Sequence, residues 1–281
     1  MTQPWQADFY RRPLQDEQGK PLWELVLCNG DRSFAYSAFC PQAEANSTWI
    51  AAQLQTCMAQ QGKPERVLVF RPQALSLLEA ACKSLAIPVQ ATRQTPALKA
   101  WLQEKVSDYR QMPHYTGQPY EPVKLEQPPP LPVPETLWGE KWRFAAIAAA
   151  DLELLFRNRP MPIVDLPDAL LPNALGLAST TPIPGIVMDA GRQSMRLAQW
   201  LKQVQPAYLT YIPGEPDGVI LDAGLVDRWV LATFDDPEAI AAAKTFRDRQ
   251  QAAQGLHFLL IQPDDSGVTY TGVWFLRRQS P

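Results

Sequence analysis

The sequence lacks the local motifs by which common enzymes bind nucleotides or activate a nucleophile. It contains no G-x-G-x-x-G, no G-x-x-x-x-G-K-[ST] and no G-x-S-x-G. A Rossmann cofactor site, a P-loop and a hydrolase nucleophile elbow therefore have no support. Cysteine and histidine are scarce, with four and two residues in a chain of 281, and no C-x-x-C occurs. We therefore expect no metal, no cofactor and no catalytic residue, and we expect the cysteines to be reduced and buried.

Long apolar runs and a basic charge balance are also missing. No run approaches the ~20 residues needed to cross a bilayer, and the N-terminal residues do not resemble a secretion signal. We therefore expect a cytoplasmic protein without a membrane span. The formal net charge is −3, which is not typical of a nucleic-acid binder. Arginine nevertheless outnumbers lysine 17 to 9, and arginine suits phosphate contact and stacking on rings. A confined patch of arginines and aromatic side chains is compatible with this composition.

Proline divides the chain into two parts. The range 113–134 contains eight prolines, including three in succession at 128–130. Because proline lacks the amide donor and restricts the preceding residue, neither a helix nor a central strand can persist there. We predict an N-terminal domain over 1–112, a proline-rich linker over 113–137 and a C-terminal domain over 138–281.

Both predicted domains show strands alternating with amphipathic helices, which indicates an α/β fold with mixed sheets. In the first, a hairpin of residues 22–28 and 33–40 turns at Asn29-Gly30, and Asn46 is a candidate N-cap. Strands at 67–70 and 87–90 alternate with helices, and Pro88 suggests a sheet edge for the latter. The strands and helices expected in the second domain are listed here: strands 142–148, 185–188, 207–212, 219–221 and 229–232, helices 193–204 and 237–254, and a closing hairpin from 255 to 278.

Polar and aromatic residues on the predicted strands are the candidate functional groups. His257 shares a strand face with Leu259 and Ile261, so it is either a hydrogen-bonded core histidine or a surface contact. Arg228 either braces a neighbouring acid or lies beside the stacking ring of Trp229. We expect three tryptophans to be exposed: Trp138, Trp142 and Trp274.

A metal-dependent nuclease is the enzymatic alternative. Such sites collect carboxylates at strand ends to hold magnesium, and Glu24, Asp189, Asp222 and Asp227 lie on or beside predicted strands. No Asp-x-Lys or Glu-x-Lys occurs, although one common nuclease arrangement uses it. The competing interpretation is that these acids cap turns or pair with arginines, namely Arg192, Arg196 and Arg228.

Several short motifs, in order along nearly the whole chain, carry a resemblance to a known family. They are Trp5-x-x-Asp8-Phe9-Tyr10-x-Arg12-Pro13, Trp23-Glu24-Leu25, Asn46-Ser47, Phe70-Arg71, Ile87-Pro88, Ala97-Leu98-x-x-Trp101-Leu102, Met112-Pro113, Ile183-Pro184-Gly185, Leu225-x-Asp227-Arg228-Trp229, Gly255-Leu256-His257-Phe258-Leu259 and Gly272-x-Trp274. In this order they resemble the Tab-type family of RNA-binding proteins of cyanobacteria and chloroplasts.

The resemblance implies a non-catalytic, two-domain α/β protein that binds RNA. In chloroplasts, relatives act on the untranslated leader of a photosystem I message and promote translation and photosystem assembly. The expected partner is therefore such a leader RNA, with ribosomes or assembly factors as further partners. A nuclease acting on RNA and a protein scaffold for assembly factors stay open as alternatives. The candidate RNA-binding residues occupy motif or loop positions: Arg12, Arg71, Arg93, Arg228, His257 and Trp274.

Overall fold

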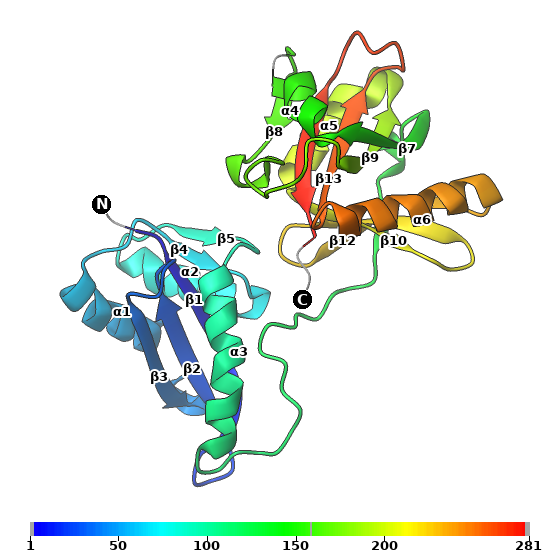
Figure 1. Ribbon diagram of the computed structural model, residues 1–281. Helices are drawn as coiled ribbons and strands as arrows, with labels where there is room; N and C mark the ends of the chain where they lie inside the picture. Colours follow the sequence, from blue (N-terminus) through cyan, green and yellow to red (C-terminus); the bar gives the residue numbers. More distant parts are fainter. Residues whose placement is uncertain (1–2, 158, 279–281) are drawn as a thin grey trace. The chain divides into compact units, whose positions relative to one another are not determined.

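The computed structural model describes residues 3–157 and 159–278. The chain divides into two compact units, Met1–Glu126 and Gln127–Pro281, which are drawn in Figure 1. The division falls inside the proline-rich range 113–137. Residues before it pack with the first unit, and residues after it pack with the second.

The first unit is a five-stranded mixed sheet with three α-helices. Its elements are β1 (Trp5–Gln15), β2 (Pro21–Cys28), β3 (Ala35–Pro41), the 3-10 turn η1 (Gln42–Glu44), α1 (Ser47–Gln61), β4 (Val67–Val69), α2 (Pro72–Ser84), β5 (Val89–Ala91) and α3 (Pro96–Gln111). The strand order is β3-β2-β1-β4-β5, with β1, β2 and β3 antiparallel and β4 and β5 parallel to β1. The predicted hairpin is confirmed, because Cys28 pairs with Ala35. Asn46 caps α1 by accepting a 2.9 Å hydrogen bond from the amide of Trp49.

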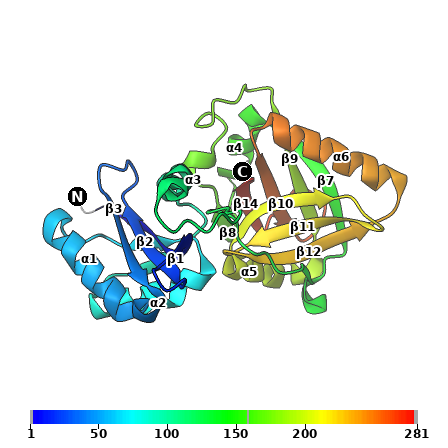
Figure 2. The ribbon, with the colours of Figure 1, turned by 90° about the horizontal axis from the view of Figure 1, so that it is seen from below.

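Helices cover both faces of this sheet (Figure 2). The larger core lies between the sheet and helices α1 and α2, and its members include Phe9, Leu25, Ile50, Leu54 and Leu78. The smaller core lies on the opposite face, under α3, and comprises Val26, Cys28, Phe70, Leu98 and Leu102. Val123 and Leu125 from the proline-rich range pack against the smaller core. Residues 113–126 therefore form a strap over the α3 side of the sheet.

The second unit contains two sheets and three α-helices. Its elements are β6 (Leu131–Pro132), η2 (Glu135–Leu137), β7 (Lys141–Ala148), α4 (Ala149–Arg157), β8 (Ile163–Asp165), η3 (Asp168–Leu170), β9 (Pro182–Asp189), η4 (Gly191–Gln193), α5 (Ser194–Val204), β10 (Pro206–Ile212), β11 (Asp217–Ala223), β12 (Asp227–Phe234), α6 (Pro237–Ala252), β13 (Leu256–Gln262) and β14 (Gly272–Arg277). The five-stranded sheet has the order β7-β9-β13-β14-β8, and the four-stranded sheet has the order β10-β11-β12-β6.

Alternation along β13 places a core on each face of the five-stranded sheet. Leu259 and Ile261 belong to the core shared with α5, α6 and the four-stranded sheet. Leu256, Phe258 and Leu260 belong to the core on the other face, with residues of α4. In Figure 2 strands β10, β11 and β12 lie over one face of the five-stranded sheet. The predicted α/β class with mixed sheets in two domains is confirmed.

Four of the described strands and helices were not predicted from the sequence: β1, β6, α4 and β8. The sequence of β1 has Asp8, Arg12 and Pro13 where a simple strand pattern would be apolar, and α4 follows β7 directly without a turn signal. Strands β6 and β8 are only two and three residues long. All four cysteines are free and buried, as expected. Within the described ranges no helix is both long and apolar enough to span a bilayer.

Candidate functional site

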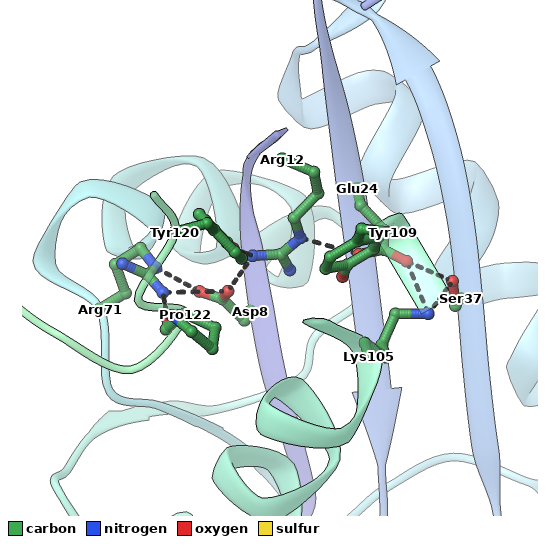
Figure 3. Close-up of polar contacts among 9 residues, drawn as sticks. All are labelled: Asp8, Arg12, Glu24, Ser37, Arg71, Lys105, Tyr109, Tyr120 and Pro122. Carbon is green, nitrogen blue, oxygen red and sulfur yellow. Dashed lines mark hydrogen bonds and ion pairs between the residues drawn. The ribbon is translucent and has the colours of Figure 1, made fainter. Parts of the chain in front are cut away.

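A network of buried charges lies between the sheet of the first unit, helix α3 and the strap (Figure 3). Asp8 and Arg12 are four residues apart on β1 and therefore point to the same face of the sheet, as does Glu24 on the adjacent strand β2. This is the face that α3 covers, whereas Phe9 points to the core under α1 and α2.

Asp8 joins two arginines. Nη1 of Arg12 donates to Oδ2 of Asp8 at 3.0 Å, and Nε of Arg71 donates to Oδ1 at 2.7 Å. Both arginines also hold the strap, because Nη1 of Arg12 donates to the hydroxyl of Tyr120 at 2.8 Å and Nη2 of Arg71 donates to the carbonyl of Pro122 at 2.5 Å. The four contacts fasten the strap to the sheet.

Glu24 gathers the remaining groups. Its Oε2 accepts from Nε of Arg12 at 2.7 Å and from the hydroxyl of Tyr109 at 2.5 Å. Its Oε1 accepts from the hydroxyl of Ser37 at 2.6 Å and lies 2.9 Å from Nζ of Lys105. Lys105 and Tyr109 both come from α3, so Glu24 links this helix to the sheet.

The network is almost closed to solvent. The side chains of Asp8, Arg12 and Glu24 are fully buried, and that of Arg71 is 4 % exposed. Burial lowers the pKa of Arg12, but the charge of Asp8, with contributions from Tyr120, Tyr109 and Glu24, outweighs it and raises the pKa well above the usual value. Burial also raises the pKa of Tyr109, so this phenol stays protonated and can donate to Glu24.

A groove of about 590 Å³ opens beside the network, between β1 and the strap. Its polar and aromatic lining includes Tyr10, Arg11, Gln15, Arg71, Gln73, Gln118, Tyr120, Glu121, Lys124 and Glu126. Tyr10 is half-buried and Arg11 is exposed. The guanidinium of Arg71 lies 4.3 Å from the centroid of the Tyr10 ring and that of Arg11 lies 5.8 Å from it, which are cation–π distances.

The structure brings together two of the six predicted RNA-binding residues, Arg12 and Arg71. Their guanidinium groups share Asp8. Arg93 follows β5 in the same unit and is half-exposed, and its carbonyl accepts a 2.7 Å hydrogen bond from Nζ of Lys99. The other three candidates, Arg228, His257 and Trp274, belong to the second unit.

His257 is fully buried and hydrogen-bonded within the protein. The amide of Leu209 donates to Nε2 at 2.8 Å, so Nε2 carries no proton. Nδ1 then carries the proton and donates to the carbonyl of Gly255 at 2.8 Å. Burial lowers the pKa of His257 to about 4. Of the two interpretations, the hydrogen-bonded core histidine is confirmed.

Trp274 corrects one expectation about exposure. It is 1 % exposed and packs in the core between the two sheets, opposite Leu259 of β13. The expectation that it is exposed is wrong, because β14 is covered on both faces. Trp138 is 62 % exposed, as expected, whereas Trp142 is half-buried and its ring packs 5.3 Å from that of Phe234.

Arg228 braces an acid, as one interpretation proposed. Its Nε lies 3.6 Å from Oδ1 of Asp222, and its side chain is 19 % exposed. Four of the six candidates (Arg12, Arg71, His257 and Trp274) are therefore buried and have partners inside the protein. Their contact with RNA stays a prediction, and their side chains are engaged inside the protein in this structure.

The acids of the nuclease alternative belong to two different units, and Glu24, Asp189 and Asp222 each have partners. Glu24 belongs to the first unit, and Asp189 and Asp222 to the second. Asp189 accepts from Nη1 of Arg143 at 2.8 Å and from Nε2 of Gln262 at 2.7 Å. In the part of the chain that the structure describes, no three His, Cys, Asp or Glu side chains are grouped to hold a metal ion.

Sequence reasoning missed the groove residues Tyr10, Lys124 and Tyr120. Tyr10 stands between Asp8 and Arg12 in a run of alternating polar residues, which is the signal that could have pointed to it. The strap residues lie in a segment that we interpreted as a linker, so nothing in their local sequence indicated a contact with β1.

Comparison with known proteins identifies the family. Residues 4–105 match "RNA-binding protein Tab2/Atab2 N terminal", and residues 120–277 match "RNA-binding protein Tab2/Atab2, C-terminal domain". The chain belongs to the Tab2/Atab2 family of RNA-binding proteins. The predicted resemblance is confirmed, and with it an RNA-binding role.

The similar curated relatives include two plant proteins. "Protein TAB2 homolog, chloroplastic" of Arabidopsis thaliana is 29% identical over 278 residues, which cover 97% of this chain and 74% of the relative. The protein of the same name from Zea mays is 29% identical over 283 residues, covering 97% and 70%. Among solved structures, the HTLV-2 integrase catalytic core domain with magnesium is 15% identical over 40% of this chain and 77% of that chain, with a TM-score of 0.27. At this score the likeness carries no argument.

Proposed function

We propose that this RNA-binding protein is non-catalytic and promotes translation and biogenesis of photosystem subunits, those of photosystem I in particular, by binding the 5′ leader of a photosystem message. The observation that carries the proposal is the match of both units to one RNA-binding family, with chloroplastic relatives that align over 97% of the chain. The expected setting is the cytoplasm of a photosynthetic bacterium, with ribosomes or assembly factors as further partners.

The charge distribution supports a particular mode of RNA binding. With a net charge of −3, the protein does not offer a broad electrostatic clamp for a duplex. We expect the protein to bind single-stranded RNA through base stacking and a few cationic side chains, because base stacking does not require a high positive charge on the protein.

Filter binding of photosystem leader RNA at several salt concentrations tests the RNA-binding step. We expect saturable binding with a shallow negative dependence on salt, and no cleavage of labelled RNA when magnesium is added. Absence of saturable binding at low salt would remove the proposal, and magnesium-dependent cleavage would replace it with the nuclease.

Ribosome profiling of a strain that lacks the gene tests the translational step. The proposal expects reduced ribosome occupancy on a photosystem I message while the level of that message is maintained. Unchanged occupancy on all photosystem messages would contradict it, even if the protein binds RNA in vitro.

A further inference from the structure

We propose that the groove between β1 and the strap of residues 113–126 is the site at which the protein holds single-stranded RNA, with Tyr10 stacking on a base and Arg11 contacting a phosphate. This inference rests on the proposed RNA binding and adds the place and the residues. It assigns the first contact to the N-terminal unit.

The balance of charge favours this unit. Residues 1–126 carry 13 basic and 12 acidic side chains, whereas residues 127–281 carry 13 and 17. The phosphate backbone is repelled by a net negative surface, so RNA is expected to dock on the less acidic unit.

Tyr10 offers a ring that is held in place before RNA arrives. Arg71 lies against it at 4.3 Å, and Trp23 contacts it edge-on at 6.1 Å between ring centroids. Arg71 is in turn fixed by Asp8 and by the carbonyl of Pro122. A preorganised ring loses little conformational entropy on binding, which favours stacking of a base on its exposed part.

Arg11 is the cation best placed for phosphate. Its side chain is exposed and lies next to Tyr10. Within residues 3–157 and 159–278 Arg11 forms no ion pair, whereas Lys124 across the groove pairs with Glu121 at 2.5 Å. Arg11 can therefore take up a phosphate without first breaking an ion pair.

The remaining lining suits the edges of bases. Gln15, Gln73 and Gln118 are exposed at the groove, and each amide offers both a donor and an acceptor. The groove has a volume of about 590 Å³ and is partly open to solvent. The carboxylates of Glu121 and Glu126 also line the groove. They repel the phosphates of RNA and the side chains of an acidic peptide alike.

The test uses the full chain and a fluorescein-labelled single-stranded oligouridylate. Tyr10→Leu removes the ring, and Tyr10→Phe keeps it. Arg11→Ala removes the exposed cation, and Arg110→Ala makes the same change at an exposed arginine at the end of α3, outside the groove lining. Thermal unfolding of each variant establishes that it is folded.

We expect Tyr10→Leu to weaken binding about tenfold, because one stacked base contributes that order of affinity, and Tyr10→Phe to recover most of the loss. Arg11→Ala is expected to weaken binding several-fold and to reduce the salt slope by about one, because one phosphate contact is lost. Arg110→Ala is expected to bind like the wild type.

Photocrosslinking of a 4-thiouridine form of the same RNA provides a readout on the unmutated protein. Crosslinks are expected within residues 10–15, 71–73 or 116–126. If the wild type binds RNA but the groove variants bind equally well, or if the crosslinks map elsewhere, the groove is not the site and the proposed function stands. If the groove variants bind RNA normally and a proline-rich peptide binds in the groove instead, the groove is a site for a protein partner. If the wild type binds no RNA, both proposals fail.

Discussion

Glu24 shows how much one residue can determine in this protein. Its carboxylate faces Arg12, Lys105, Tyr109 and Ser37 in a site closed to water. A buried carboxylate is costly unless it is paired, and here each of its oxygens has two partners. Removing its charge leaves Lys105 without this counter-ion and leaves Arg12 with Asp8 alone.

Glu24→Gln is therefore expected to lower the free energy of unfolding by about 3–5 kcal/mol, as measured by urea denaturation. The matched control is Glu104→Gln, which removes the same charge from the exposed ion pair with Arg32. Surface pairs contribute less than about 1 kcal/mol. Equal losses in the two variants would show that the network does not depend on the charge of Glu24.

His257 makes stability depend on pH. Its pKa in the folded protein is about 4, below the unfolded value of 6.5. Below pH 6.5 His257 therefore binds a proton in the unfolded chain but stays neutral in the folded protein. The free energy of unfolding consequently falls as the pH falls from 6.5 toward 4.

Between pH 7.5 and pH 5 this histidine is expected to cost about 2 kcal/mol of stability, a window in which ordinary carboxylates titrate little. Denaturation curves of the wild type and of His257→Gln at the two pH values measure it. The variant should be less stable at pH 7.5 but should lose less on acidification. An equal pH dependence in both proteins would rule out His257 as the cause.

At the scale of elements, strands β9 and β13 of the second unit pack closely at Gly185 of β9. A Cβ at this position would lie 2.4 Å from ring atoms of Phe258 on the paired strand β13. The absence of a side chain therefore makes room for the ring in the core under α4.

Gly185→Ala is expected to destabilise the protein by about 1–3 kcal/mol through overpacking, as measured by thermal or urea unfolding. Adding Phe258→Leu should restore part of the loss that Gly185→Ala causes, so that the two effects are not additive. Gly30→Ala is the control, because nothing lies within 4 Å of a Cβ there. Strict additivity would show that the ring and the glycine do not interact.

At the scale of the whole molecule, the strap decides where the first unit ends. Residues 113–126 supply the hydroxyl of Tyr120 and the carbonyl of Pro122 to the buried arginines, and cover the core under α3. The boundary predicted at residue 112 would remove these contacts, and a boundary at Glu126 keeps them.

A fragment of residues 1–126 is therefore expected to unfold cooperatively and to be more stable than a fragment of residues 1–112 by at least about 2 kcal/mol, because hydrogen bonds to charged groups are lost with the strap. Circular dichroism during urea denaturation of the two fragments compares them. Equal stability of the two fragments would show that residues 113–126 act only as a linker.

Local pattern determined most of the elements. The pairing of β2 with β3 and the closing hairpin follow from alternation, and the cap at Asn46 follows from capping chemistry, both of which depend on neighbours in the sequence. The connection between β2 and β3 is the loop 29–34 rather than a two-residue turn at Asn29-Gly30, because Arg32, not Gly30, has the positive φ. The two domains and the family resemblance could also be predicted from the sequence. A proline-rich range and the order of motifs along the chain can be recognised without knowing any tertiary contact.

Only the folded structure decided which charged and aromatic side chains reach the surface. Asp8 meets Arg71 across 63 positions, and Arg12 meets Tyr120 across 108, so nothing near any of these residues in the sequence announces the pairing. The local sequence does not distinguish an arginine that faces water from one that pairs with a buried carboxylate. Burial and pairing depend on segments that folding brings together. They make Arg12 and Arg71 members of an internal network and place Tyr10 and Arg11 at the groove.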